Sequence, residues 1–519
     1  MLGGYAKDPS LTSRTSRLTP RAHNAAQDSK MSLFLESRQA RGRSKFLPLG
    51  LAGVGISLLG SAILSGAVKG ASLGVFLLFA VAILFLLPYH QTEVDVLHPV
   101  RVLGALWCFL LGLASLHLTI IISSWNSYAW FCLMSGPASF IGGFLLYNKK
   151  SHSQGNSRVL ASDVRRQGPT PLQPSILLRT AAICVALGIA ALSYEYSRIG
   201  AIPILSENID LYRGMFFDYR FHHIIFKVIY LITIFEKYAF ILACFFLFSS
   251  GKKTMRQTVQ AWVIASVAFL GHSSQGGRQY PYELLVLACV LYHYIRRPFK
   301  YRHLAFAAVL LFLLLAFGGY FRSVRSDPRA SLEPVAAMSD LPRGPLGDSL
   351  VYGYYTVTIG FEQFSRMTSD LPTGGSARGG HMFYFLHRFI PRQGLGEWGN
   401  YPGGVVFTYL ADFYADYGIW GILAGSFLLG YAYSFVYKRA VRRSSLYWIY
   451  AQALFIYCLT YFPYVNLFSE YAGWFIDLAS MAAIMAFISH SGRKGHMNTL
   501  LTPRGGDLPF RAAQFRVDP

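Results

Sequence analysis

Residues 101–122 read RVLGALWCFLLGLASLHLTIII, a run whose one formally charged side chain is Arg101. About 20 apolar residues are enough for a helix to cross the hydrocarbon core of a bilayer. Comparable runs recur from near residue 47 to near residue 489. A segment in lipid must satisfy its backbone hydrogen bonds internally, and a helix does so. The sequence therefore predicts an all-α, polytopic integral membrane helix bundle.

The overall composition agrees with this fold class. Of the 519 residues, 53% are hydrophobic and 14% are charged, and the mean hydropathy is +0.36. Soluble domains average about 25% charged residues. The formal net charge of +22 would indicate nucleic acid binding in a soluble chain. Here the basic residues lie in the loops between apolar runs, which is the positive-inside pattern, so no nucleic acid partner is expected.

About twelve membrane spans are expected, and basic loops orient them. Threading these spans puts the clusters of Lys and Arg on one side, which the positive-inside rule makes cytoplasmic. Both termini fall on that side, with residues 1–45 as a disordered tail, 46–490 as the transmembrane domain and 491–519 as a second tail. The expected spans are 47–68, 71–88, 101–122, 127–147, 177–196, 231–250, 257–271, 281–296, 303–320, 409–437, 446–463 and 470–489.

Three longer segments fall on the outer, periplasmic side. They are residues 196–230, a tight turn at 271–281, and a long loop at 321–408. A loop that long in a compact membrane domain is usually functional. Its Gly and Pro punctuation and aromatic stretches predict short helices over the membrane surface. The stretch 350–367 is expected to lie along that surface, because Glu362 and Arg366 occur near its end.

Two long outer stretches, residues 196–226 and 321–408, use arginine without lysine. Lysine is common in the cytoplasmic loops. Arginine alone favours bidentate recognition of oxyanions such as phosphate. Snorkelling, or pairing with nearby acids, is the alternative. The outer arginines are Arg198, Arg213, Arg220, Arg278, Arg322, Arg325, Arg329, Arg343, Arg366, Arg378, Arg388 and Arg392.

Other outer residues are candidates for chemistry or sugar contact. The rings of Tyr352 and Tyr355 can stack on sugars or pack within the bundle. His381 is a candidate general base because histidine titrates near neutral pH. Asp412 and Asp416 begin the span at 409–437 with the i,i+4 spacing that places them on one helix face. They are candidates for function or for pairing with the arginines.

Other classes of site find no support in the sequence. The six cysteines lie in apolar runs without a CxxC pair, which argues against a disulfide framework or zinc site. Residues 394–399 match GxGxxG but follow no predicted strand, so they are not expected to bind a dinucleotide. HExxH, P-loop and GxSxG motifs are absent. No metal and no cofactor are expected.

Several segments, taken in order, resemble the oligosaccharide repeat-unit polymerases, the Wzy-type O-antigen and exopolysaccharide polymerases. The resemblance covers about residues 45–490. It is carried by the set of segments and their topology, since the family has few fixed motifs. The segments are RIGAIPIL at 198–205, GGR at 276–278, GGYFR at 318–322, FIPR at 389–392 and YLADFYADYGIWG at 409–421.

The resemblance implies a reaction at the periplasmic face of a bacterial inner membrane. A glycan on undecaprenyl diphosphate would be transferred to a new lipid-linked repeat unit, extending a surface polysaccharide. The expected diphosphate ligands are Arg278, Arg322 and Arg213. His381 is the expected base, with Asp412 in reserve, and Tyr352 and Tyr355 are expected to contact sugar. Partners would be the lipid-linked oligosaccharides, membrane lipids and a chain-length regulator protein.

Two alternatives share the same substrates. An O-antigen ligase-like glycosyltransferase uses the same donor and a similar polytopic plan, and the sequence separates it poorly from a polymerase. A flippase or secondary transporter of lipid-linked oligosaccharide belongs to another class. Transporters often contain internal repeats and helices broken at mid-membrane. This sequence contains no evident repeat, which favours the enzyme.

Overall fold

The computed structural model describes residues 95–116, 125–153, 173–222, 224–251, 253–300, 344–371, 407–443, 445–464 and 473–501. Isolated positions between 78 and 85 and between 303 and 318 are also described. The expected span at 47–68 and most of the one at 71–88 lie outside these residues, as does part of the one at 303–320. So do the first expected tail, Arg322, His381 and most of the 321–408 loop.

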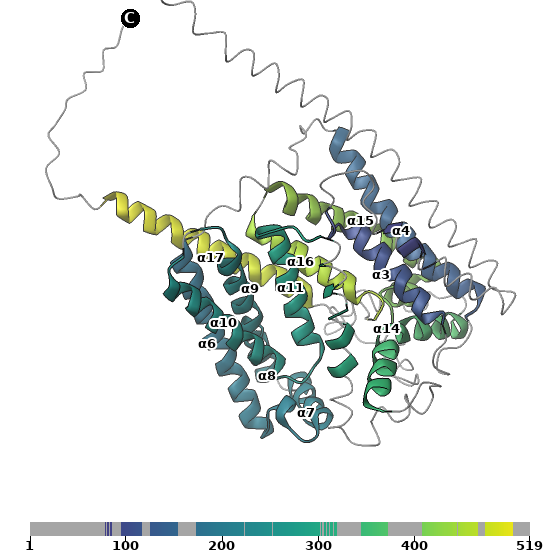
Figure 1. Cartoon of the computed structure of the whole chain (residues 1–519), viewed down its shortest axis with the longest axis horizontal. Coiled ribbons are helices and arrows are strands. Elements are labelled where there is room, and N and C mark those ends of the chain that lie inside the picture. Colours follow the sequence, from purple (N-terminus) through teal and green to yellow (C-terminus); the bar gives the residue numbers. More distant parts are fainter. Residues whose placement is uncertain are drawn as a thin grey trace, which may run out of the picture.

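All regular elements in the described part are helices, and they form two neighbouring groups (Figure 1). The first group contains α3 (Pro99–Ala114), α4 (Ser127–Ser153), α14 (Pro345–Asp370) and α15 (Leu410–Arg443). The second contains α6 (Pro174–Ile199), α8 (Ile224–Thr233), α9 (Phe235–Phe248), α10 (Met255–Ser273), α11 (Gln279–Ile295) and α17 (Gly473–Leu501).

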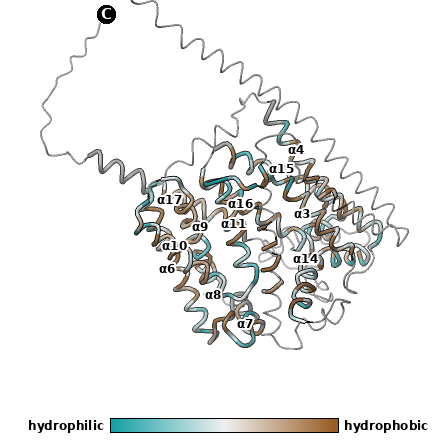
Figure 2. Tube along the Cα trace, viewed as in Figure 1, coloured by the Kyte–Doolittle hydropathy of each residue, from teal (hydrophilic) through white to brown (hydrophobic). Residues whose placement is uncertain are grey.

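A central helix joins the two groups, and short elements close one end. The helix α16 (Leu446–Tyr461) packs against α11 on one side and against α15 and α3 on the other. The short helix η1 (Pro203–Leu205) and α7 (Ile209–His222) lie at one end of the bundle, where α7 also contacts α8 (Figure 1). Hydrophilic residues occur in α7, whereas apolar residues recur along the helices of the bundle (Figure 2).

Four of the described helical segments are long and apolar enough to cross a membrane. They are Ser127–Lys149, Pro174–Ile199, Val228–Phe248 and Leu410–Val441. Two shorter apolar helices, Pro99–Ala114 and Trp474–His490, accompany them. The structure thus supports a helical membrane protein. The expected number of about twelve spans goes beyond what these helices show.

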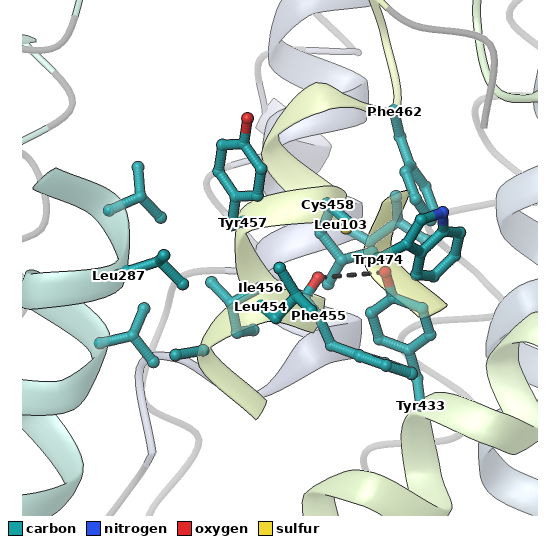
Figure 3. Close-up of a cluster of buried hydrophobic side chains, with 14 of the residues drawn as sticks. Leu103, Leu287, Tyr433, Leu454, Phe455, Ile456, Tyr457, Cys458, Phe462 and Trp474 are labelled. Carbon is teal, nitrogen blue, oxygen red and sulfur yellow. Dashed lines mark hydrogen bonds between the residues drawn. The ribbon is translucent and has the colours of Figure 1, made fainter. Parts of the chain in front are cut away.

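The middle of the bundle is packed with aromatic side chains (Figure 3). The Tyr433 hydroxyl donates a hydrogen bond to the backbone oxygen of Phe455 at 3.0 Å. The ring of Phe462 stacks on Tyr409, with the ring centroids 4.3 Å apart. These contacts join α15 to α16 and to the residue that follows it. They hold the start of α15 beside the end of α16.

The expectation of short helices on the membrane surface is wrong for the described part of the long loop. The part of the 321–408 loop that is described forms one helix of 26 residues, α14, instead of short helices. Phe361 and Glu362 of α14 are fully buried, and the helix packs against α3 and α4, so α14 belongs to the bundle. The helix α17 covers most of the expected span at 470–489 and continues to Leu501.

Glycines allow α4 and α15 to approach closely. A Cβ added to Gly143 would collide with the backbone oxygen of Phe427, and one added to Gly430 would collide with that of Phe140. Small residues that let backbones meet are typical of helix pairs in membranes, where van der Waals packing drives association. The two helices pack together along much of their length.

We expect Gly143→Ala to destabilise the protein by about 1–3 kcal/mol, because the methyl group must push the two helices apart. Gly142→Ala is a matched control, since a Cβ there meets only the Phe427 ring at 4.0 Å. Alanine is also a better helix former than glycine by about 0.5–1 kcal/mol. Thermal unfolding of the purified protein in detergent measures both effects. Equal stability of the two variants would contradict the proposed helix contact.

Candidate functional site

The turn between α10 and α11 is shaped by glycine. Gly276 has φ of 78°, a left-handed conformation that favours glycine. A Cβ at this position would lie 3.2 Å from the Pro203 side chain, so the turn is pressed against η1. The backbone N–H of Ile204 donates to the Ser274 oxygen at 3.3 Å. Arg278, the N-cap residue of α11, follows directly from this turn.

Segments that are distant in the sequence meet at this turn. Pro203 belongs to the RIGAIPIL segment and Arg278 to the GGR segment. A Cβ built on Gly318, the first residue of GGYFR, would lie 3.6 Å from Cγ and Cδ of Arg278. Three of the segments that carry the family resemblance therefore lie together. The fourth, at 409–421, begins beside Phe462, and residues 389–392 are outside the described part.

A cavity of about 130 Å³ opens between α7, α11, α14 and the end of α16. Typical small-molecule pockets measure about 300–1,000 Å³. This cavity is smaller and suits a group the size of a phosphate better than a whole oligosaccharide. Two arginines, Arg213 and Arg278, line it. The other lining residues are Leu110, Gln279, Tyr282, Thr356, Val357, Thr460, Tyr461, Pro463 and Tyr464.

The guanidinium of Arg278 is held in place from two sides. Its Nη1 donates to the Thr356 Oγ1 at 3.3 Å. Its Cζ lies 4.4 Å from the centroid of the Tyr352 ring. Such a cation–π contact contributes about 0.5–2 kcal/mol. Tyr352 therefore supports the arginine, and its contact with sugar stays a prediction.

The electrostatics of the cavity favour an anion. Arg213 and Arg278 bring two positive charges to its wall, and both side chains are half-buried. No carboxylate or imidazole occurs among the described residues that line it. The other polar groups are hydroxyls and an amide, which can donate hydrogen bonds to an oxyanion. Two of the three arginines predicted to bind diphosphate thus share one cavity.

Tyr355 lies on α14 close to the cavity. Burial raises its pKa to about 12, with further contributions from the neighbouring hydroxyls of Tyr464 and Tyr352. The phenol therefore stays protonated at neutral pH and remains a hydrogen-bond donor. Tyr464 itself lines the cavity, which places Tyr355 next to the site but outside the lining residues.

The predicted general base is not among the lining residues. His381 lies outside the described residues. Asp412 is 1% exposed, in the first turn of α15, and Asp416 is fully buried one turn later. The helix is interrupted directly afterwards, at Tyr417 and Gly418, where Gly418 has φ of 59° and ψ of −145°. The expected span at 409–437 is therefore a broken helix. Glycine at position 418 makes the break possible, because glycine adopts a positive φ readily.

No protein-family model, curated protein or solved structure matches this chain. The cavity geometry and the outer arginines are therefore the features that bear on function.

Sequence reasoning missed a buried ionic cluster beside the cavity. Lys237 Nζ lies 2.9 Å from Glu283 Oε1 and 2.6 Å from Asp477 Oδ2. The Tyr238 hydroxyl donates to Asp477 Oδ1 at 3.0 Å. These groups come from α9, α11 and α17. A signal was present, because charged residues inside apolar runs are rare and often functional. Lys237 and Asp477 both lie in such runs.

Proposed function

We propose that this chain is a membrane glycosyltransferase that polymerises undecaprenyl-diphosphate-linked oligosaccharide repeat units. The reaction would take place at the periplasmic face of a bacterial inner membrane and would yield a surface polysaccharide. The observation that carries the proposal is the cavity that Arg213 and Arg278 share. Each arginine was predicted from the sequence as a diphosphate ligand, and they come from segments 65 residues apart.

The chemistry of the proposed reaction fits this site. A hydroxyl oxygen of the new repeat unit attacks C1 of the donor glycan and forms the new glycosidic bond. The bond from C1 to the diphosphate oxygen breaks, and the electron pair leaves with the diphosphate. Fixed positive donors stabilise the charge that develops on this leaving group. The hydroxyl proton passes to a base, for which His381 and Asp412 remain the predicted candidates, or to the departing diphosphate.

The cavity size is consistent with diphosphate recognition. Its volume suits the charged headgroup, while the glycan and the lipid tail would extend outside it. The helices Pro174–Ile199 and Val228–Phe248 are apolar enough to span a membrane and pack next to α7 or α11. Lipid around them would lie near the headgroup of a bound substrate. The donor carries its own energy in the diphosphate bond, so the reaction needs no nucleotide.

A transporter of the same lipid-linked sugars is the second candidate. The break of α15 at Tyr417 and Gly418 favours it, because substrate sites in transporters are often built from discontinuous helices. Buried Asp412 and Asp416 precede this break. The cavity with its two arginines lies elsewhere, at the α10–α11 turn, and favours the transferase.

The sizes of surface glycans in a strain that lacks this chain distinguish these functions. We expect single repeat units in that strain and a full ladder after complementation with the wild type. Arg213→Ala should express normally but restore about 10²–10³-fold less polymer, the usual cost of removing one such charge donor. Arg198→Ala is the matched control, because Arg198 is exposed and does not line the cavity.

Other outcomes would reject the polymerase. Long glycan that stays on its carrier lipid would identify a ligase. Loss of even single units from the outer face would identify a flippase. A normal ladder in the strain that lacks the chain would remove lipid-linked glycan as the substrate.

A further inference from the structure

His272 and Glu283 face each other across the turn that carries Arg278. His272 is the last but one residue of α10, and Glu283 lies in the second turn of α11. Their facing atoms, Nε2 and Oε2, are 3.8 Å apart, which is too far for a hydrogen bond. The His272 ring also contacts the ring of Tyr280 edge-on, with centroids 4.9 Å apart. A shift of His272 would thus move groups in both α10 and α11, the two helices that the turn connects.

The cluster around this pair carries unbalanced charge. Among the three side chains in direct contact, Lys237 contributes one positive charge and Glu283 and Asp477 contribute two negative charges, which sum to one negative charge. The three side chains are at most 10% exposed. Uncompensated charge in a buried site is costly. One proton on His272 would balance the charge of these three side chains.

Buried polar atoms next to the pair lack hydrogen bonds. Within the described part, His272 Nε2, Gln275 Oε1 and the Tyr450 hydroxyl have no hydrogen-bond partner. Their residues are 5%, 2% and 0% exposed. Buried atoms of this kind require an explanation, because leaving one unsatisfied costs about 1–3 kcal/mol. A site that gains and loses a proton would explain these atoms, because their hydrogen bonds would form only in the protonated state.

We propose that His272, between Gln275 and Glu283, is a buried proton-binding site whose occupancy is linked to oxyanion binding in the Arg278 cavity. This inference rests on the proposed function only for the identity of the natural anion. A proton suits the cluster better than a metal ion, because Lys237 already occupies the position between the two carboxylates. No group of three metal-ligating side chains occurs in the described part.

The imidazole has a route to take up the proton. The Gln275 Nε2 lies 3.5 Å from His272 Nδ1, so in the neutral state Nδ1 accepts and Nε2 carries the hydrogen. Protonation places a second hydrogen on Nδ1. The amide of Gln275 then turns so that its unpartnered Oε1 accepts this hydrogen. The charged Nε2–H is attracted to Glu283, and the 3.8 Å gap closes.

Other titratable groups around His272 bear on the same proton. They come from four neighbouring helices, and none of the hydroxyls or thiols among them is charged near neutral pH. These groups are Glu236, Lys237 and Tyr238 of α9, Glu283 of α11, Tyr450 and Cys458 of α16, and Asp477 of α17.

The direction of the linkage follows from charge. Burial lowers the pKa of His272, and Glu283 acts in the opposite direction without reversing the shift. The imidazole is therefore neutral at neutral pH while the cavity is empty. An anion beside Arg278 favours a positive charge nearby, so anion binding draws a proton onto His272. By reciprocity, acid strengthens anion binding.

Sulfate tests this linkage, because it remains doubly charged over the pH range concerned. The purified chain in lipid nanodiscs is titrated with sulfate by calorimetry at about pH 5.5 and about pH 7.5. Buffers of different ionisation enthalpy reveal how many protons are taken up. We expect the wild type to bind about 5–10-fold more tightly at the lower pH, with proton uptake.

His272→Gln should bind sulfate with no pH dependence and no proton uptake. Glu283→Gln is the second variant and should lose the linkage as well. His490→Gln, which alters an exposed histidine of α17, should behave as the wild type does. Sulfate binding without pH dependence in the wild type, or pH dependence that survives in His272→Gln, would overturn the linkage and leave the anion site intact. Absence of sulfate binding at both values would overturn the linkage and the proposed diphosphate site together.

Discussion

Replacing Arg278 by alanine is expected to weaken oxyanion binding by about 10–100-fold and to reduce polymer formation by about 10²–10³-fold. The substitution removes a charge donor from the cavity, together with the bond to Thr356 and the stacking on Tyr352. The helix start should persist, because Arg278 makes no side-chain cap. Sulfate titration and the size ladder of surface glycans measure the two effects.

Arg278→Lys separates charge from geometry. Lysine keeps the positive charge but lacks the planar fork that stacks on a ring and forms two parallel bonds. We expect it to recover about a tenth of the wild-type affinity. Arg198→Ala, which removes an exposed arginine outside the cavity, should bind sulfate normally. If Arg278→Ala and Arg198→Ala gave the same affinity as the wild type, the cavity would not be the anion site.

Lys237→Met should destabilise the folded protein by about 3–5 kcal/mol. The substitution leaves Glu283 and Asp477 buried next to each other without the cation that both contact. Two like charges in a low-dielectric interior repel, and each has lost a hydrogen bond. Thermal unfolding of the purified variant in detergent, compared with that of the wild type, measures the loss.

Two further variants make the result specific. The triple variant Lys237→Met, Glu283→Gln, Asp477→Asn removes all three charges, and we expect it to recover most of the stability. Lys300→Met alters an exposed lysine and should change stability by less than about 0.5 kcal/mol. A single variant as stable as the wild type would show that the cluster does not carry buried charge.

Arg213 and Arg278 show what could and could not be predicted from the sequence. Their residue type and their place in lysine-free outer segments were enough to predict an oxyanion site. Their meeting in one cavity was not predictable, because it requires Gly276 to fold the turn onto η1 and α14 to bring Thr356 and Tyr352 to Arg278. Tyr352 shows the same limit, because its contact with the guanidinium of Arg278 depends on where the tertiary structure places α14 and could not be predicted from the sequence.

The sequence by itself determined that the chain is helical and apolar enough for a membrane. A hydrophobic run of about 20 residues is a property of consecutive residues, so it can be recognised without the tertiary structure. Only the tertiary structure decided which polar residues act together. Lys237, Glu283 and Asp477 are up to 240 residues apart, and the buried face of α14 is defined by α3 and α4. Desolvation and pairing of charges depend on distance in space, which no local pattern of residues specifies.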